Sequence, residues 1–364
     1  MNAYIVDTKA LEENLAILRG KAGSAVVYAV VKGNGYGLGA GALARFYAGR
    51  GIDHFAVTDL AEARAVRQET AGEILMLRGT CNGEELRELL SLDVTCSVGS
   101  PEDLAALEAL GRELGCRPRV HVKVDTGMGR YGFLPEETPA MARVFDRLTV
   151  TGIYTHFHTA GNRKVTMAQY GAFRGAVDAL RAMGLEPGLV HCCNSLAFWY
   201  YPELHLDAVR LGSALLGRVG YGPRAGLRRA GYVRAEVEEL RCLPKGHNVG
   251  YGGDCRLRRE TRIAVVGVGY LHGFSVERGY DVFRPRDCLR SMGRYLKYLL
   301  KGKKLWVEVN GRPCPVLGHV GMVNLVADVT DVPCQVHDPV TVQINPLDLK
   351  GMDVVFREDG DKGP

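Results

Sequence analysis

Short apolar, β-branched runs alternate with longer amphipathic stretches from Ala25 to about Leu216. Runs of this length are typical of buried strands. The stretches between them, such as LAEARAVRQE and PEDLAALEALGREL, repeat apolar residues at helical spacing and open near Asp, Ser or Pro, which favours helices. The runs span residues 25–31, 54–57, 73–77, 94–98, 119–124, 150–156, 189–192 and 206–211.

Eight such runs alternating with helical stretches predict an α/β fold, a TIM-like (β/α)8 barrel, which we assign to residues 1–228. After Arg228 the pattern changes to strand-like segments such as TRIAVVGVGY and KLWVEVNGRPCPVLGHV, which are separated by Gly, Pro and Asn. Residues 229–364 are therefore expected to form a second, mostly β C-terminal domain.

One segment of this second domain has a different pattern. Residues 286–305, RDCLRSMGRYLKYLLKGKKL, carry apolar residues at helical spacing and a strongly basic opposite face. We predict an inserted basic helix over about residues 284–304. We expect it to be a solvated surface helix, because one amphipathic basic helix is weak ground for a nucleic-acid or membrane contact.

Composition adds little to this picture. The net charge of +5 in 364 residues is too small to indicate a polyanionic partner. None of the ten cysteines forms a C-x-x-C pair, so we expect free thiols in a reducing compartment. No apolar run approaches the roughly 18 residues of a membrane helix, and the first residues lack the pattern of a secretory leader. The expectation is a cytoplasmic protein with no nucleic-acid and no membrane partner.

The first candidate for chemistry is Lys32, which ends the apolar run AVVK and precedes the glycine-rich turn GNGYGLG. The C-terminal end of a barrel strand is where TIM-barrel active sites form. A lysine amine attacks a carbonyl only when it is unprotonated, and burial favours that form by lowering its pKa. A solvated surface lysine is the alternative.

Further segments give this motif a context. AVVKGNGYGLG is followed, in order, by VKVDTGMGRYGF, THFHTA, HCCNS, VRLGSALLG, VGYGGDCRLRRETRIAVVGVGY and CPVLGHVGMVNLVADVT. Together these segments span most of the chain and resemble those of the alanine racemase family, fold-type III enzymes that depend on pyridoxal 5'-phosphate. The resemblance implies a barrel followed by a β domain, in agreement with the pattern above, and a homodimer with shared active sites.

The resemblance implies a cofactor site at the mouth of the barrel. It makes Lys32 the lysine that binds pyridoxal phosphate and places Tyr36, Ser195, Gly212 and Ser213 around the phosphate. Loops at this end of a barrel commonly hold phosphates through hydroxyls and backbone N–H groups. For Ser195 the alternative is helix capping, since NSLAF opens a helix-like run.

Arg210 indicates the type of reaction. In the family that this chain resembles, the matching Arg is the partner of the cofactor's pyridine nitrogen, and His156 is expected to orient it. An Arg does not give up its proton, so the ring nitrogen stays unprotonated and the cofactor is a weaker electron sink. That suits racemisation, whereas related decarboxylases have a Glu at this place.

Racemisation also needs a proton carrier on each face of a planar intermediate. The resemblance assigns one face to Lys32 and the other to Tyr251, acting from the partner subunit. A monomer would then lack half of its site, so we expect at least a dimer. Tyr270 and Met322 match residues that contact the substrate.

Two residues of VKVDTGMGR match a further pair of the family. Arg130 matches the Arg that binds the substrate carboxylate, for which a planar guanidinium is well suited. Lys123 matches a lysine that is carbamylated, a change that turns a cation into an anion able to hold Arg130. A salt bridge between Lys123 and Asp125 is the alternative.

The match weakens near the substrate. Where the family has Cys-Met-Asp-Gln, this chain has Gly321-Met322-Val323-Asn324, so an apolar residue replaces an acidic one. The family's late Asn-Tyr-Glu segment is not found after INPLDLKGMDVVFRED. Interconversion of L- and D-alanine, which supplies D-alanine for peptidoglycan, is the leading hypothesis. Racemisation of another amino acid such as serine is the alternative, as is a degenerate, non-catalytic cofactor-binding paralogue.

Two readings of other classes remain open. His156 and His158 with His191 suggest a metal-dependent barrel hydrolase, although no acidic ligand stands beside them and we expect no metal. The second is a cofactor-binding homeostasis protein of the same barrel, which has no β domain and therefore no counterpart of Tyr251.

Overall fold

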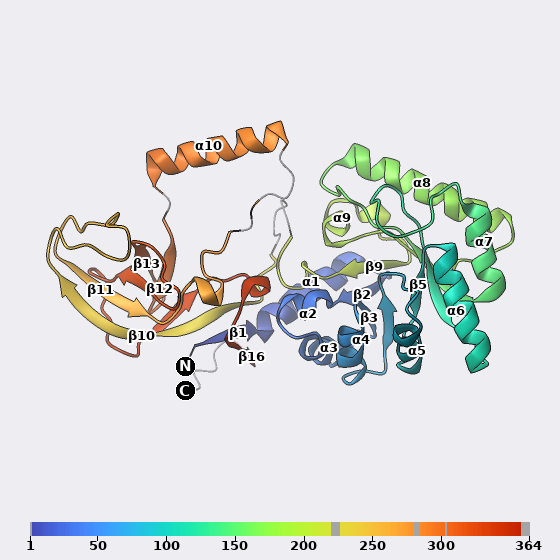
Figure 1. Cartoon of the computed structure of the whole chain (residues 1–364), viewed down its shortest axis with the longest axis horizontal. Coiled ribbons are helices and arrows are strands. Elements are labelled where there is room, and N and C mark those ends of the chain that lie inside the picture. Colours follow the sequence, from blue (N-terminus) through green and yellow to red (C-terminus); the bar gives the residue numbers. More distant parts are fainter. Residues whose placement is uncertain (1, 220–225, 278, 280–283, 303, 358–364) are drawn as a thin grey trace. The chain divides into compact units, whose positions relative to one another are not determined.

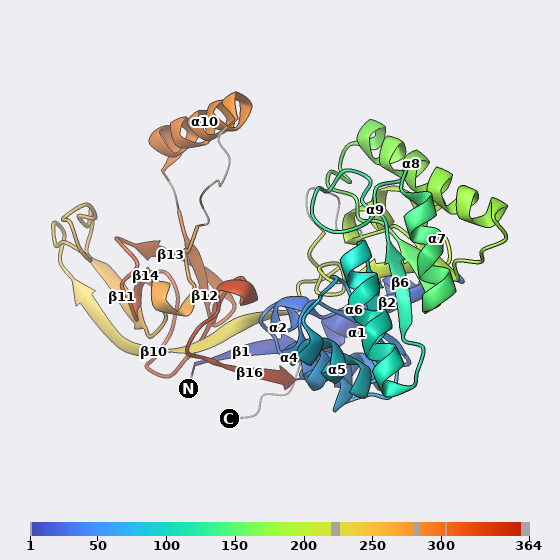
Figure 2. The same ribbon diagram turned by 45° about the vertical axis from the view of Figure 1, so that its right-hand side comes forward.

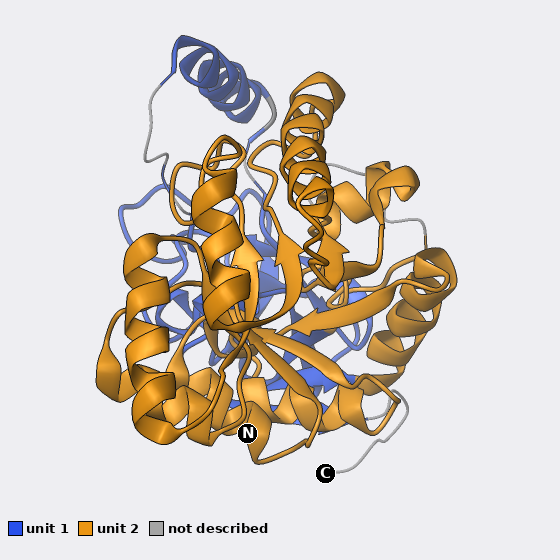
Figure 3. Cartoon of the chain, turned by 90° about the vertical axis from the view of Figure 1, so that its right-hand side faces the viewer, with its two compact units in different colours: residues 1–7, 231–364 blue, residues 8–230 orange. Residues whose placement is uncertain are grey.

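The computed structural model describes residues 2–219, 226–277, 279, 284–302 and 304–357. It divides the chain into two compact units, Thr8–Ala230 and a second made of Met1–Asp7 with Gly231–Pro364 (Figure 3). We call the first the barrel unit and the second the β unit. No helix among the described residues is long and apolar enough to cross a membrane.

The barrel unit is built on eight parallel strands, as the sequence pattern predicted. They pair in the order β4-β3-β2-β9-β8-β7-β6-β5, and a parallel bridge between Leu75 and Thr95 joins the two ends of this order. Figure 3 shows the strands around a common centre with helices outside them. The strands are β2 (Val26–Val30), β3 (His54–Val57), β4 (Glu73–Met76), β5 (Cys96–Val98), β6 (Arg119–Lys123), β7 (Thr149–Tyr154), β8 (Leu189–His191) and β9 (Ala208–Leu211).

Polar side chains cap the starts of several helices that follow these strands. A side-chain oxygen of the residue before the helix accepts a backbone N–H of the first turn at Asp59, Asn82, Ser100 and Asn162. The helices are α1 (Thr8–Ala22), α2 (Lys32–Tyr36), α3 (Ala40–Ala48), α4 (Leu60–Arg67), α5 (Gly83–Ser91), α6 (Pro101–Leu114), α7 (Thr138–Arg147), α8 (Arg163–Ala182), α9 (Ser195–Tyr200) and the 3-10 turn η1 (Pro202–Leu204).

The β unit is one mixed sheet in the order β11-β14-β13-β12-β15-β10-β1-β16, in which β10 also pairs with β11. Its strands are β1 (Ala3–Asp7), β10 (Gly231–Leu243), β11 (Thr261–Val266), β12 (Trp306–Val309), β13 (Arg312–Leu317), β14 (Leu325–Asp328), β15 (Pro339–Val342) and β16 (Asp353–Arg357). Its helical elements are η2 (Tyr270–His272), α10 (Pro285–Lys301) and η3 (Pro346–Asp348).

The observed division differs from the expected one at the start of the chain. We had placed residues 1–228 in the barrel, but β1 pairs antiparallel with β10 and parallel with β16, so residues 1–7 belong to the β unit. The inserted helix α10 covers residues 285–301 of the predicted 284–304, a range in which Lys303 lies outside the described residues.

Candidate active site

Lys32 lies two residues after the last residue of β2 and begins a left-handed turn. Gly33, Asn34, Gly35, Tyr36 and Gly37 all have positive φ, from 49° to 88°. A left-handed conformation costs an L-residue roughly 1–2 kcal/mol, and Gly avoids this cost while Asn tolerates it better than most. The glycine-rich sequence KGNGYG is therefore what lets the chain wind to the left here. α2 is a left-handed turn rather than an ordinary helix.

Within this turn, Tyr36 is the residue whose side chain least favours a left-handed backbone conformation. Its hydroxyl packs against Gly212, where an added Cβ would lie only 2.1 Å from the Tyr36 oxygen. Burial raises the pKa of Tyr36 to about 12, opposed by a hydrogen bond from the Ser213 backbone. The turn after β2 and the segment after β9 are thus fitted to one another, and Gly212 is needed for the fit.

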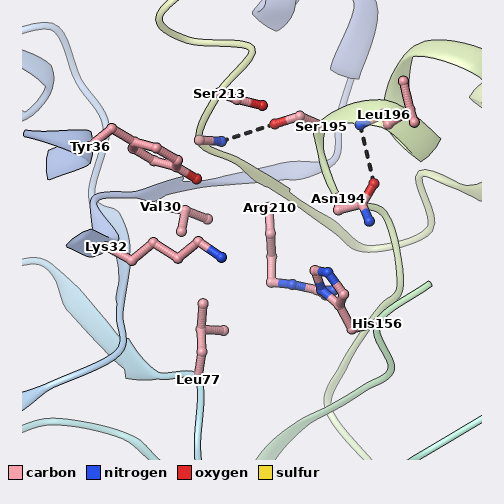
Figure 4. Close-up of a pocket in the computed structure, with 11 residues that line it drawn as sticks. Val30, Lys32, Tyr36, Leu77, His156, Asn194, Ser195, Leu196, Arg210 and Ser213 are labelled. Carbon is pink, nitrogen blue, oxygen red and sulfur yellow. Dashed lines mark hydrogen bonds between the residues drawn. The ribbon is translucent and has the colours of Figure 1, made fainter. Parts of the chain in front are cut away.

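Ser195 lies beside the same segment. Its Oγ accepts hydrogen bonds from the backbone N–H groups of Gly212 (3.1 Å) and Ala214 (3.3 Å). The helix cap is Asn194, whose side chain accepts from the backbone of Leu196 and Ala197. Capping therefore does not account for Ser195, and its hydroxyl faces the segment after β9 (Figure 4).

These residues line a cavity of about 330 Å³ at the mouth of the barrel. Figure 4 shows the side chains of Lys32, Tyr36 and Arg210 directed toward its centre. The lining comprises Val30, Lys32, Tyr36, Leu77, His156, Asn194, Ser195, Leu196, Arg210, Gly212 and Ser213. All the residues expected around the cofactor are brought together in it.

Arg210 is fixed deep in this cavity by hydrogen bonds. It is only 3% exposed. One terminal nitrogen donates to His191 Nδ1 at 2.7 Å, and the other donates to the carbonyl oxygens of Thr155 (2.7 Å) and Cys192 (3.3 Å). The expectation that His156 orients Arg210 was wrong, because the hydrogen-bonded histidine is His191; His156 lines the cavity beside it (Figure 4).

His191, which the sequence suggested only as a metal ligand, forms a buried pair with His121, a residue that sequence reasoning did not identify. Its Nε2 lies 3.0 Å from Nδ1 of His121, and its ring stacks against Tyr28 and Tyr154. Burial lowers the pKa of His191 far below its usual range and that of His121 to about 3. Both rings are neutral near pH 7, so Nδ1 of His191 can accept from Arg210 while its Nε2–H donates to His121.

A second cavity of about 230 Å³ adjoins the first, since Lys32, Leu77 and His156 line both. Four of its lining residues are basic and none is acidic. The basic residues are Lys32, Arg78, Lys123 and Arg130, and the others are Thr58, Leu77, Tyr131, Tyr154 and His156. A cavity of this charge is suited to an anionic group.

Lys123 is the most perturbed of these cations. It is 6% exposed, and its Nζ donates to the backbone oxygen of Leu77 at 3.0 Å. Burial, followed by the charges of Arg210 and Arg130, lowers the pKa of Lys123 to about 7. The alternative of a salt bridge to Asp125 is not observed, because the Asp125 carboxylate accepts the backbone N–H groups of Gly127, Met128 and Arg130.

The carboxylate of Asp125 folds the loop that carries Arg130. The carboxylate oxygens lie 2.7–3.1 Å from the three backbone nitrogens, so the loop closes around one side chain.

In the same cavity, desolvation and the charge of Arg130 lower the pKa of Lys32, with Arg210 adding to the effect and Glu62 opposing it. Burial and Arg210 lower the pKa of His156 to about 3. The site thus combines arginine cations with amines and an imidazole whose pKa values are lowered.

Tyr251, Tyr270 and Met322 belong to the β unit. Tyr251 is 77% exposed at the tip of a loop in which Gly250, Gly252 and Gly253 have positive φ. The loop is closed by a hydrogen bond from Val249 N to Cys255 O and by an Asp254–His319 contact of 2.8 Å. Backbone hydrogen bonds from Tyr270 to Gly321 and from Leu271 to Met322 hold the other two residues beside each other.

The arrangement argues against the metal-dependent hydrolase. Both ring nitrogens of His191 are engaged, by Arg210 and His121. Nδ1 of His158 contacts the neighbouring Thr159 hydroxyl at 2.6 Å. No group of three or more His, Cys, Asp or Glu side chains able to hold a metal ion occurs in the part of the chain that the structure describes.

Comparison with known proteins gives the same family along the whole chain. Residues 6–219 match the model of the alanine racemase N-terminal domain and residues 230–346 that of the C-terminal domain. A barrel-only homeostasis protein would lack the second match. An alanine racemase of Desulforamulus reducens is 31% identical over 351 residues, covering 93% of this chain and 88% of the relative. One from Methanococcus maripaludis is 29% identical, covering 93% and 87%.

Solved structures agree. The alanine racemase of a D-cycloserine-producing Streptomyces lavendulae superposes with a TM-score of 0.82 at 26% identity, covering 98% of this chain and 97% of that one. The biosynthetic alanine racemase of Pseudomonas aeruginosa gives a TM-score of 0.79 at 27% identity, covering 98% and 99%. The chain therefore belongs to the alanine racemase family of isomerases.

Proposed function

We propose that this protein is a pyridoxal-phosphate-dependent racemase that interconverts L- and D-alanine by a two-base mechanism, with Lys32 as one base and Tyr251 of the partner subunit as the other. The observation that carries the proposal is the convergence of Lys32, Tyr36, Ser195 and Arg210 on one cavity, which Gly212 and Ser213 also line. Family membership supports the same activity.

The cavity fits the cofactor on chemical grounds. The Tyr36 and Ser195 hydroxyls, Ser213 and the close backbone approach that Gly212 permits form a cradle suited to a phosphate. Lys32 supplies the amine that bonds to the cofactor, and Arg210 supplies a cation for the ring nitrogen. When bound, pyridoxal phosphate would weaken the Cα–H bond of the amino acid by drawing electron density from it.

The residues of this chain would then bind the charged groups of the cofactor and substrate and transfer protons at Cα. Among the described residues no hydrogen bond engages Nε of Arg210, so its N–H, together with the second N–H of Nη1, is left to donate to the ring nitrogen. The pKa of Lys32 is lowered by desolvation and by Arg130, so its amine spends more time as the free base that accepts a proton from Cα. Arg130 would bind the substrate carboxylate in the cationic cavity. Tyr251, Tyr270 and Met322 would complete the site from the partner, which requires a homodimer.

Solvent-deuterium exchange at Cα, followed by NMR with chiral analysis of the products, tests the proposed activity. Protein reconstituted with pyridoxal phosphate is incubated separately with L-alanine, L-serine and L-lysine. Exchange with appearance of D-alanine is the expected result. Faster reaction of serine would favour the alternative substrate. The exposed side chains of Met322 and Val323 are the structural reason for testing it. No exchange with any of the three would contradict racemase activity and favour a non-catalytic paralogue.

The close approach at Gly212 gives a prediction for cofactor binding. Gly212→Ala would place a methyl group 2.1 Å from the Tyr36 hydroxyl, so the left-handed turn and the cradle must shift apart. We expect affinity for pyridoxal phosphate to fall at least about tenfold, or roughly 1.4 kcal/mol, as measured by fluorescence titration. Gly171→Ala is the matched control, because nothing lies within 4 Å of an added Cβ there. Unchanged affinity in Gly212→Ala would exclude this segment as the phosphate cradle.

The lowered pKa of Lys123 gives a prediction about its carbamylation. Only a neutral amine adds carbon dioxide, and a pKa of about 7 means that the neutral form dominates above that pH. We expect a carbamate signal in ¹³C NMR with labelled bicarbonate, which grows as the pH rises through about 7 and is absent in Lys123→Met. A signal that survives this substitution would belong to another amine. Its complete absence in the unmodified protein at pH 8 to 9 would rule out the modification.

A further inference from the structure

Helix α10 exposes the apolar face by which a surface helix is normally held to its own domain. Its apolar side chains follow one another at helical spacing and are 56% to 81% exposed. They are Leu289, Met292, Tyr295, Leu296, Leu299 and Leu300. Figures 1 and 2 both show the helix apart from the strands of its own unit. A solvated surface helix, as we expected from the sequence, would not leave this stripe uncovered.

The charges of α10 have one sign at its surface. Arg286, Arg290, Arg294 and Lys297 recur every three or four residues and lie on one side of the helix, away from the apolar stripe. Asp287 is the one acidic residue in the helix sequence. It is buried and paired with Arg284 at 2.8 Å and Arg290 at 3.6 Å. The exposed helix surface therefore consists of an apolar stripe and a cationic face.

We propose that α10 lies on the surface of an anionic lipid bilayer, with its apolar stripe in the headgroup region and its cations on the lipid phosphates. A helix with an apolar stripe along one side and a face rich in Arg and Lys along the other binds membranes in this way without crossing them. Its 17 residues span about 25 Å in the membrane plane. The residues of α10 line neither barrel cavity, and the proposal does not depend on the racemase activity.

Charge complementarity favours this occupant over a second copy of the chain. Pairing two α10 helices through their apolar stripes would cover the stripes but bring no opposite charge to either cationic face, because the cations lie on the other side of each helix. An anionic bilayer instead supplies both an apolar layer and the opposite charge. Each Arg or Lys near such a surface contributes roughly a fivefold gain in partitioning at moderate salt.

Vesicle sedimentation of the full-length holoprotein tests the proposal. We expect binding to vesicles of equal parts phosphatidylcholine and phosphatidylglycerol, little binding to phosphatidylcholine alone, and release near 1 M salt, where the Debye length is about 3 Å. In Leu299→Trp, the new indole should shift its emission to the blue and be quenched by brominated lipid only with anionic vesicles. Equal binding to both vesicle types, or no binding to either, would overturn the proposal.

Substitutions then locate the contact. Arg286→Gln with Lys297→Gln should weaken binding about 25-fold, and Leu296→Ser with Leu299→Ser should weaken it at least as much. Lys164→Gln and Met183→Ser alter exposed side chains of the barrel unit and should leave binding unchanged. If the controls weaken binding as much as the α10 variants, the contact is general surface charge and the proposal fails. A lower oligomeric mass by light scattering in the Leu296→Ser, Leu299→Ser variant, without vesicle binding by the unmodified protein, would assign the stripe to a second copy.

Discussion

Tyr251→Phe is expected to lower racemisation by about 10³-fold while leaving the absorbance of the bound cofactor and the fold unchanged. A positioned acid or base contributes typically 10²–10⁴-fold, and removing the hydroxyl leaves one face of the substrate without a proton carrier. Because Tyr251 is 77% exposed at a loop tip, loss of one oxygen removes no buried hydrogen bond. The measurement is Cα deuterium exchange started separately from each enantiomer of alanine.

The two enantiomers distinguish the role of Tyr251 from a general defect. Only the enantiomer whose Cα–H faces Lys32 should still exchange, and it should do so without forming its mirror image. Tyr200→Phe, a change at a partly exposed tyrosine of α9, is the control and should leave both rates unchanged. Unchanged racemisation by Tyr251→Phe would refute the two-base mechanism.

Arg210→Met is expected to lower racemisation at least about 10²-fold and the free energy of unfolding by roughly 2–5 kcal/mol. The stability cost arises because the Thr155 and Cys192 carbonyls and Nδ1 of His191 lose their donor while they remain buried. The cost in activity arises because the ring nitrogen of the cofactor would lose its cationic partner. Chemical denaturation of the cofactor-free protein and the racemisation rate of the reconstituted protein measure the two effects separately.

Arg174→Met is the matched control for Arg210. Arg174 pairs with Asp178 on the exposed face of α8, and such surface pairs contribute well under 1 kcal/mol. We expect its stability and racemisation to remain close to those of the unmodified protein. If Arg210→Met were as active as this control, Arg210 could not be the partner of the ring nitrogen.

The barrel could be predicted from the sequence because its order is local. Each apolar run from residues 25–31 to 206–211 became one strand, and the Asp59 and Ser100 caps before the two quoted periodic stretches became helix starts. The candidate site residues of the barrel were named by the resemblance of the motifs to the alanine racemase family, and loops at one mouth of a barrel lie close together. Lys32, Arg210 and Ser195 accordingly meet in one cavity.

Other features depend on contacts that no local pattern carries. The pairing of β1 with β10 joins residues more than 220 positions apart, so the first strand could not be assigned to the second unit. The left-handed turn of residues 33–37 was expected only as a flexible glycine-rich loop. Nor could the sequence show that α10 leaves its apolar face exposed.

His121 could have been found from strand alternation. His121 and Lys123 stand two residues apart on β6, so both face the same side of the sheet. Once Lys123 is placed in the site, His121 must point into the barrel as well. Gly152 on the neighbouring strand makes room for it, because a Cβ there would lie 2.5 Å from the imidazole. The pairing of His191 with Arg210, in contrast, needs three-dimensional distances.

The place of β1 has a consequence for the order of events on the ribosome. This strand leaves the exit tunnel long before both of its partners, because it lies between β10, which begins at residue 231, and β16, which begins at residue 353. At about 5–20 residues per second, it waits roughly 10–45 s for the first of these partners. During that time the barrel can close while both edges of β1 remain open. A chaperone that shields nascent strands should therefore matter most for the first seven residues, and a stalled chain should keep them accessible to protease until β10 has emerged.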